Sequence, residues 1–252
     1  MTGLLLRLAG PMQSWGEHSS FSQRDTGRFP TRSGLIGLIA CALGRRRTDP
    51  VDDLAALRFT IRVDRHGEMM EDFHTVGGGM PPHLTVPTAE GGRRKPATAT
   101  IVSRRHYLAD AVFVVAVEGP SELVTQIASA LRSPAWAPYL GRRSCPAEAP
   151  LLVRERVEDP VDELRRTVPL CRRPPRKGDP DVTFVHEHGG AGRERLDLND
   201  SPISFDPLRR RYVGRPAYVE TERLPAQLCA GLGVPYLKAL KEYLDQREGR
   251  SP

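Results

Sequence analysis

Arginine side chains are concentrated in a polar loop that leads into a short apolar segment. The loop contributes three arginines: Arg24, Arg28 and Arg32. Residues 33–43 are predicted to form a buried helix, which Thr31 or Ser33 can cap and which Gly44 can end. Because the first turn of a helix presents N–H groups and a positive dipole, this junction predicts a phosphate-binding site. The alternative is a capped core helix behind a solvated basic loop.

The overall charge favours a nucleic-acid partner over a membrane. The 252 residues carry 37 Lys and Arg against 31 Asp and Glu, a net charge of +6. Lysine occurs at only four positions, and arginine can fork two hydrogen bonds onto a phosphate and stack on bases. A high genomic GC content would also enrich arginine. No apolar run approaches the ~20 residues of a membrane span, so we expect a cytoplasmic protein.

A second arginine loop, Tyr139–Pro146 (YLGRRSCP), joins glycine to paired arginines. Aromatic side chains near such loops can stack on bases, although an aromatic such as Trp15 more often plugs the edge of a core. The candidate RNA-binding residues are therefore Trp15, Arg24, Arg28, Arg32, Ser33, Arg104, Arg105, Tyr139, Arg142 and Arg143. For each arginine the alternative is a solvated loop charge.

Hydrophobic patterning predicts an α+β protein. The expected elements are a strand over 3–9, the helix over 33–43, strands over 59–64 and 111–117, a helix over 122–131 capped by Ser121, and a strand over 151–157. Their order is that of a ferredoxin-like βαββαβ unit, the fold of the RNA recognition motif. Because residues 112–117 are wholly apolar, we expect this strand in the interior and bound bases on the loops rather than on an open sheet.

An extended segment over 68–76 leads into an insertion over about 77–104. This insertion has a triple glycine, several prolines and the basic cluster Arg93, Arg94 and Lys95, with few large apolar residues. It cannot form its own core and is predicted to project. Domain 1–157 is thus followed by a weakly patterned region, 158–252, which contains a short basic strand near 209–213 and a terminal helix whose Leu237, Leu240 and Leu244 share one face.

Metal and cofactor chemistry has little support in the sequence. His186 and His188 lie in a glycine-rich segment without a third ligand, so we expect an exposed loop there. Glu68, Glu71 and Asp72 fit a solvated hairpin edge better than a magnesium site. The four cysteines are far apart and form no CxxC pair, and no nucleotide-binding GxxxxGK[ST] occurs. We expect reduced thiols, no metal and no cofactor.

Several blocks resemble one family. They are LLLRLAGPMQSWG and FSQRDTGRFPTRSGLIGLIACALG near the N-terminus, then FHTV, HYLADAVFVVAV, YLGRRSCP and RRRYVGRPAYV. Together they are similar to the Cas-five family of the RAMP superfamily, whose CasD branch supplies subunits of the type I-E CRISPR surveillance complex Cascade. The resemblance covers about residues 3–221. The tail after Thr221 has no counterpart in it.

The resemblance implies a non-catalytic RNA-binding subunit that serves antiviral defence. Such a subunit binds the 5′ handle of CRISPR RNA, caps the filament of backbone subunits, contacts the large subunit and lies near target DNA. The insertion over 77–104, with Arg93, Arg94 and Lys95, would be its thumb. The rival interpretation is a metal-independent endoribonuclease that cuts repeat RNA with His74, His106 or Tyr107. A generic RNA-binding module is the third.

Overall fold

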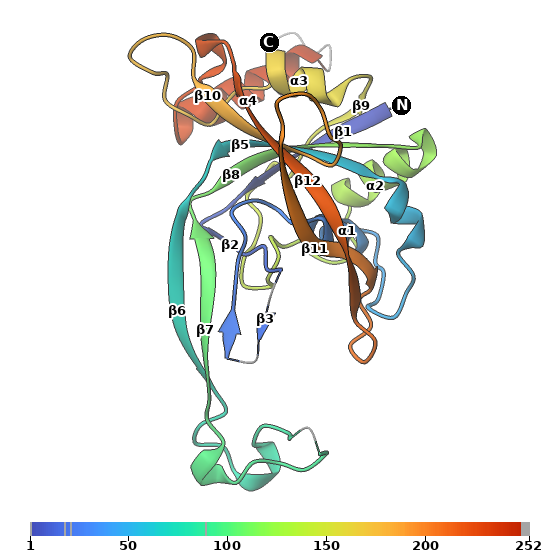
Figure 1. Cartoon of the computed structure of the whole chain (residues 1–252), viewed down its shortest axis with the longest axis vertical. Helices are drawn as coiled ribbons and strands as arrows, with labels where there is room; N and C mark the ends of the chain where they lie inside the picture. The colour runs from blue at the N-terminus through green and yellow to red at the C-terminus, as the bar shows by residue number, and fades with distance from the viewer. Residues whose placement is uncertain (1, 18, 21, 89, 248–252) are drawn as a thin grey trace.

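A seven-stranded antiparallel sheet forms the centre of the computed structural model, which describes residues 2–17, 19–20, 22–88 and 90–247 (Figure 1). Two parts of the predicted regions, residue 89 in the insertion and residues 248–252 at the C-terminus, lie outside the described residues. The strand order is β11-β12-β10-β5-β8-β1-β9. In that order the strands span Glu194–Ser204, Arg211–Arg223, Asp181–His186, Arg58–Arg65, Val112–Gly119, Thr2–Ala9 and Leu152–Val157.

The N-terminal elements follow the predicted order of strand, helix, strand, strand, helix and strand, and the mixed α/β prediction is confirmed. Helix α1 (Arg32–Ala42) connects β1 to β5, and α2 (Ser121–Arg132) connects β8 to β9. Both helices bury their apolar side chains in one core with alternate residues of the sheet. The predicted cap at Ser121 is wrong, because Ser121 already lies in the helix and Pro120 occupies the cap position.

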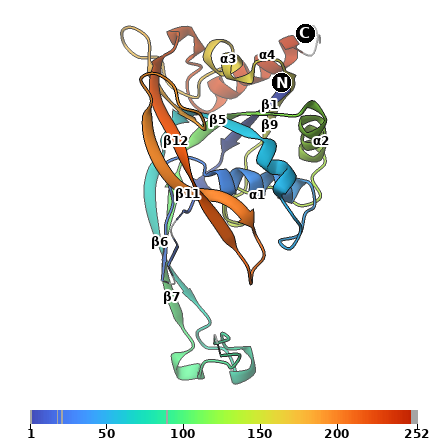
Figure 2. The ribbon, with the colours of Figure 1, turned by 45° about the vertical axis from the view of Figure 1, so that its right-hand side comes forward.

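The opposite face of the sheet is covered by α3 (Pro160–Arg166) and α4 (Val234–Arg247) (Figures 1 and 2). Strand β8 is therefore buried on both sides, and the prediction of an interior strand is confirmed. On α4 the predicted apolar face is wrong in part. Leu240 is buried but Leu237 is exposed, because Tyr236 and Tyr243 provide the rest of the buried surface.

Strands β10, β11 and β12 extend the sheet beyond β5. Patterning did not predict α3, β10 or β11, and β12 is longer than the short basic strand that was expected. Long stretches of β11 and β12 are half-buried or exposed and so lack an apolar face. The domain boundary at residue 157 stays a prediction. Strands from both sides of that residue share one sheet.

The extended segment and the end of the insertion pair as a two-stranded ribbon, β6 (Glu68–Val76) with β7 (Ile101–Ala109). At its root β7 also pairs with β2 (Met12–Gln13) and β4 (Gln23–Arg24), and β4 pairs with β3 (Ser19–Ser20). The ribbon carries its tip well away from the body, so the predicted projection is confirmed (Figure 1). Residues 101–104 belong to β7 and not to the irregular insertion.

The start of α1 is joined to the C-terminal strands by a network of buried charges. The Arg32 guanidinium binds both carboxylate oxygens of Glu187 at 2.7–2.8 Å, and its backbone N–H donates to Asp200 at 2.7 Å. Arg215 donates to both oxygens of Asp200 and lies 3.4 Å from Glu187. Two arginines and two carboxylates thus balance their charges and fix α1 against β11 and β12.

The segment with His186 and His188 was expected to be an exposed loop, which is wrong for His186 and confirmed for His188, since His188 is exposed beyond the end of β10. His186 ends β10 with 5% of its surface exposed, and its ring contacts Thr60 and Glu220. Burial and the nearby Arg193 lower the pKa of His186 to about 4, although Glu220 acts in the opposite direction. The histidine is therefore neutral at physiological pH and belongs to the core of the C-terminal strands.

We predict that Glu187→Ala lowers the free energy of unfolding by about 3 kcal/mol, because it leaves two buried guanidinium groups without their shared counter-charge. Urea unfolding followed by circular dichroism measures this change. Glu194→Ala is the matched control, since Glu194 is an exposed glutamate of β11. Equal stability of the two variants would show that the network contributes nothing to the fold.

Candidate nucleic-acid interface

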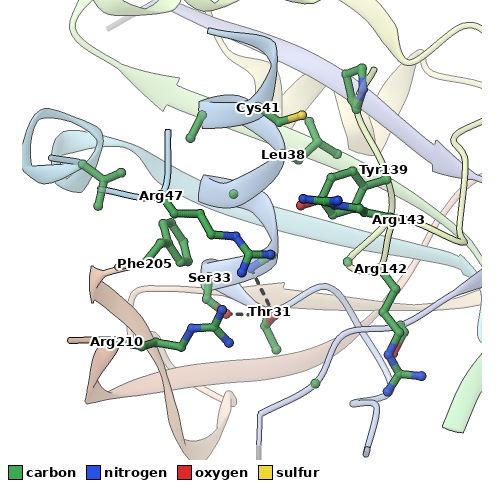
Figure 3. A pocket seen from close by; sticks show the side chains of 18 of the residues that line it. Thr31, Ser33, Leu38, Cys41, Arg47, Tyr139, Arg142, Arg143, Phe205 and Arg210 are labelled. Carbon is green, nitrogen blue, oxygen red and sulfur yellow. Dashed lines mark hydrogen bonds between the residues drawn. The ribbon is translucent and has the colours of Figure 1, made fainter. Parts of the chain in front are cut away.

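A large cleft runs across α1, between the loop over 139–146 and the hairpin formed by β11 and β12 (Figure 3). Its volume is about 1230 Å³. Small-molecule pockets usually measure about 300–1,000 Å³, so the cleft is better suited to a segment of a polymer. Its walls come from parts of the chain that are far apart in the sequence.

Positive charge dominates the lining of this cleft. Eight arginines face it, against the two carboxylates of Glu17 and Asp25. These arginines are Arg24, Arg45, Arg46, Arg47, Arg105, Arg142, Arg143 and Arg210. An excess of arginine in one groove attracts a polyanion and can hold its phosphates by paired hydrogen bonds.

The first turn of α1 opens into the cleft, but most of its hydrogen-bonding capacity is already used. Thr31 is the cap, and its hydroxyl accepts from the Gly34 N–H at 3.3 Å, while Asp200 accepts from the Arg32 N–H. The end of the helix is predicted correctly at Gly44, which has a φ of +73°. The phosphate site predicted from free N–H groups, the helix dipole and the loop arginines stays a prediction, although the buried Asp200 carboxylate already takes the Arg32 N–H at this end of the helix.

Positive charge reaches the first turn of α1 from two unexpected arginines. Arg47 follows the helix, and Arg210 belongs to the turn between β11 and β12. Both guanidinium groups point toward Ser33 and Thr31 in Figure 3, and both line the cleft. Neither arginine has an ion-pair partner within the described part of the chain, so their charges are available to a ligand. By contrast, the neighbouring Arg45 is held by Asp53, whose pKa it lowers.

Arg32 is not a ligand-binding arginine, contrary to the prediction. Its guanidinium is buried against Glu187 and also donates to the carbonyl oxygens of Leu57 and Ala55. Arg142 is also largely committed, although it lines the cleft. It donates to the carbonyl oxygens of His106, Arg24 and Asp25, so its main role is to hold the two loops together.

The loop over 139–146 reaches the cleft because of a tight contact at Gly141. This residue has a φ of +83°, and a β-carbon there would lie 1.6 Å from the carbonyl oxygen of Ser14. Only glycine fits this position. The contact places Tyr139 and Arg143 side by side on the wall that faces α1 (Figure 3). Arg143 is exposed, so it can meet a ligand directly.

Aromatic rings line the cleft, but Trp15 is not one of them. Trp15 is 1% exposed, donates to Gln13 and packs against Gly34, where a β-carbon would come within 2.7 Å of its ring. Its predicted role in base stacking is therefore wrong. The rings that face the cleft are Trp136, Tyr139, Phe205 and Tyr212.

The remaining predicted residues divide between the cleft and other surfaces. Arg24, Ser33 and Arg105 line the cleft, and Arg105 also donates to Ser103. Arg28 is exposed outside the cleft lining, and Arg104 pairs with Glu71 on the arm. The thumb cluster Arg93, Arg94 and Lys95 is exposed at the tip of the arm, where Arg93 also donates to the carbonyl oxygen of Thr85.

Two further places in the described part of the chain carry groups that could be reactive, a thiol in the cleft and a cluster of possible metal ligands. Cys41 lines the cleft, and burial raises the pKa of its thiol. His186, Glu220 and Glu222 bring three possible metal-ligand atoms within 4.8 Å of one another. Arg193 already pairs with Glu220 and Arg165 with Glu222, so this group balances its own charge.

Comparisons with known proteins agree with the resemblance seen in the sequence. Residues 3–218 match the family described as CRISPR-associated protein (Cas_Cas5). The chain is 38% identical over 226 residues to the CRISPR system Cascade subunit CasD of Escherichia coli (strain K12), covering 86% of this chain and 94% of that protein. The chain belongs to the Cas5 family of CRISPR-associated proteins.

Solved structures place this Cas5 protein among close structural relatives. A chain of a CRISPR RNA-guided surveillance complex superimposes with a TM-score of 0.89 at 52% identity, covering 97% of this chain and all of that chain. A second structure, described as a crystal structure of a Cas protein, gives a TM-score of 0.62 at 32% identity, with coverage of 92% and 98%. None of the helices in the described part of the Cas5 chain has the length and hydropathy needed to cross a membrane.

We predict that Arg47→Glu and Arg210→Glu each weaken the binding of single-stranded RNA about tenfold and lower its salt dependence, because each removes a phosphate-binding charge. Fluorescence anisotropy at several salt concentrations measures both effects. Arg28→Glu is the control, since it makes the same charge change at an exposed arginine outside the cleft. An equal loss of RNA affinity in all three variants would show that only the net charge of the protein matters, and would contradict binding in the cleft.

Proposed function

We propose that this protein is a non-catalytic subunit of a type I-E Cascade complex that binds the 5′ handle of CRISPR RNA in the arginine-lined cleft. The single observation that carries this proposal is the cleft itself. It combines exposed Arg47, Arg143 and Arg210 with aromatic rings on the wall of a cleft whose volume, about 1230 Å³, exceeds that of the usual small-molecule pocket. Phosphates pair with the guanidinium groups, and bases stack on the rings. The relationship to a Cascade subunit supports the choice of RNA.

The arrangement of the arm argues against the rival function of RNA cleavage. His106 lies directly opposite Glu71 and contacts it at 3.2 Å, so it shares a face of the ribbon with residue 71. His74 is three positions further along β6, and alternation places it on the other face. Tyr107 is buried beneath the Arg142 guanidinium. A general acid and a general base must contact the same substrate at once. His74 and His106 lie on opposite faces of the ribbon and Tyr107 is buried, so they are not placed to do so.

We predict that the purified protein binds its own repeat-derived handle RNA but does not cut the repeat. Labelled repeat RNA incubated in EDTA should remain intact, and His74→Ala and His106→Ala should behave like the wild type. Denaturing gel electrophoresis reads out cleavage. Specific metal-free cleavage that either substitution abolishes would replace this proposal by the endoribonuclease. Equal affinity for the handle and for a scrambled sequence would favour a generic RNA-binding module.

We further propose that the arm contacts the neighbouring backbone subunit and the guide, that the protein caps one end of the backbone filament beside the large subunit, and that target DNA passes nearby. The arm exposes apolar side chains along its length, including Phe73 and Val102. Its basic cluster lies at the far end (Figure 1). Apolar and basic surfaces that project from the body suit a partner that combines protein and RNA.

We predict that replacing residues 78–99 by a short Gly-Ser linker prevents incorporation into the RNA-bound complex but leaves the body folded. Co-purification with tagged partner subunits measures incorporation, and thermal unfolding checks the body. As control, Arg93, Arg94 and Lys95 are changed together to glutamine, which separates the charge of the tip from its shape. Normal incorporation of the linker variant would exclude the tip from assembly.

A further inference from the structure

The turn between β11 and β12 is fixed by its own hydrogen bonds. The Asp206 carboxylate accepts from the Leu208 N–H at 2.8 Å, and its carbonyl oxygen accepts from the Arg209 N–H at 3.1 Å. The Asp206 N–H in turn donates to the Ser204 hydroxyl. An aspartate that closes a turn in this way sets the backbone before any ligand arrives.

This turn presents an apolar side chain to solvent. Leu208 is 95% exposed, and no other large apolar side chain in the described part of the protein exceeds 64%. A single exposed leucine is common on protein surfaces. The setting of Leu208 is unusual because three consecutive arginines, residues 209–211, follow it and all are exposed.

The three arginines are free to meet an anion. Among residues 2–17, 19–20, 22–88 and 90–247, none of them has an acidic partner. Arg210 lines the RNA cleft, whereas Leu208, Arg209 and Arg211 do not. The turn therefore stands at the rim of the cleft, with an apolar residue inside a field of uncompensated positive charge. This combination favours a nucleic acid over an apolar protein surface, because burying three arginines against protein would require three acidic partners.

The residues that flank the turn pack against each other and against α1. Phe205 and Tyr212 meet edge to face across the hairpin, with ring centroids 6.4 Å apart. Phe205 also lies over Gly37 of α1, at 3.8 Å from the position of a β-carbon there. Further down, the Arg215–Asp200 pair fixes the two strands. These contacts join the turn to the body of the protein.

We propose that Leu208 is a wedge that inserts between two adjacent bases of the RNA strand at the rim of the cleft, while Arg209 and Arg211 contact the flanking phosphates. This inference rests on the proposed binding of RNA in the cleft. Apolar side chains that separate neighbouring bases, with arginines on the adjacent backbone, are an established way of deforming nucleic acids. The inserted leucine gains an apolar environment, and the bases on either side of it lose their mutual stacking.

The test uses the full chain and a series of handle RNAs of about ten nucleotides, each with 2-aminopurine at one position. Stacking quenches 2-aminopurine, so a wedge should raise its fluorescence severalfold at one or two adjacent positions in the complex. Leu208→Ala should abolish this rise and weaken binding by up to about tenfold. Leu208→Met should retain the rise, because a methionine of similar volume can occupy the same gap.

Val213→Ala is the matched control. It shortens a different exposed apolar residue, which lies on β12 beyond the turn, and should leave the fluorescence rise unchanged. Because Leu208 is exposed, its variants should melt at the wild-type temperature. Fluorescence anisotropy measures RNA binding independently of the 2-aminopurine signal, so it separates the wedge hypothesis from the hypothesis that the cleft binds RNA. RNA binding without a rise at any position, or a rise that persists in Leu208→Ala, would overturn the wedge but leave the cleft function intact. Failure of the wild type to bind RNA would overturn both.

Discussion

The buried charges that join Arg32, Glu187, Arg215 and Asp200 are the constraint on which the arginine-lined cleft depends. They connect the first turn of α1 to β11 and β12, which come from the far end of the sequence. Through this connection the hairpin lies over α1 and places Phe205 and Arg210 beside Ser33. Charges with so little solvent around them are costly when one partner is removed, so a hairpin displaced from α1 would leave buried charges unpaired.

Arginine serves two purposes in this protein, and burial separates them. Arg32 and Arg215 are held by carboxylates, and Arg142 by backbone carbonyls, so their donors hold the structure together. Arg47 and Arg210 meet no carboxylate in the described residues, and they converge on the same end of α1 (Figure 3). The first group shapes the cleft, and the second gives it an uncompensated positive charge. A count of arginines in the sequence cannot distinguish the two.

Local patterns predicted much of the fold but only part of the site. The apolar runs of β1, β5 and β8 and the capped helix α1 were predictable, because each pattern repeats within one element. The site was harder, since Trp15 and Arg32 reveal their buried roles only through contacts with Gly34 and Glu187. The basic clusters around Arg47 and Arg210 were visible in the sequence. No local pattern indicated that these two clusters lie close together. Their proximity depends on β11 and β12, which could not be predicted because their residues are largely polar and half-exposed.

RNA that lies across α1, between the loop over 139–146 and the β11–β12 hairpin, would bring its bases against the aromatic residues of the cleft. Handle RNA that carries 4-thiouridine should crosslink under long-wavelength light to residues within van der Waals contact of its bases. Mass spectrometry of the crosslinked peptides identifies those residues. The structure predicts crosslinks to Tyr139 and to the segment from Phe205 to Tyr212. Crosslinks confined to α3, α4 or the tip of the arm would contradict the account.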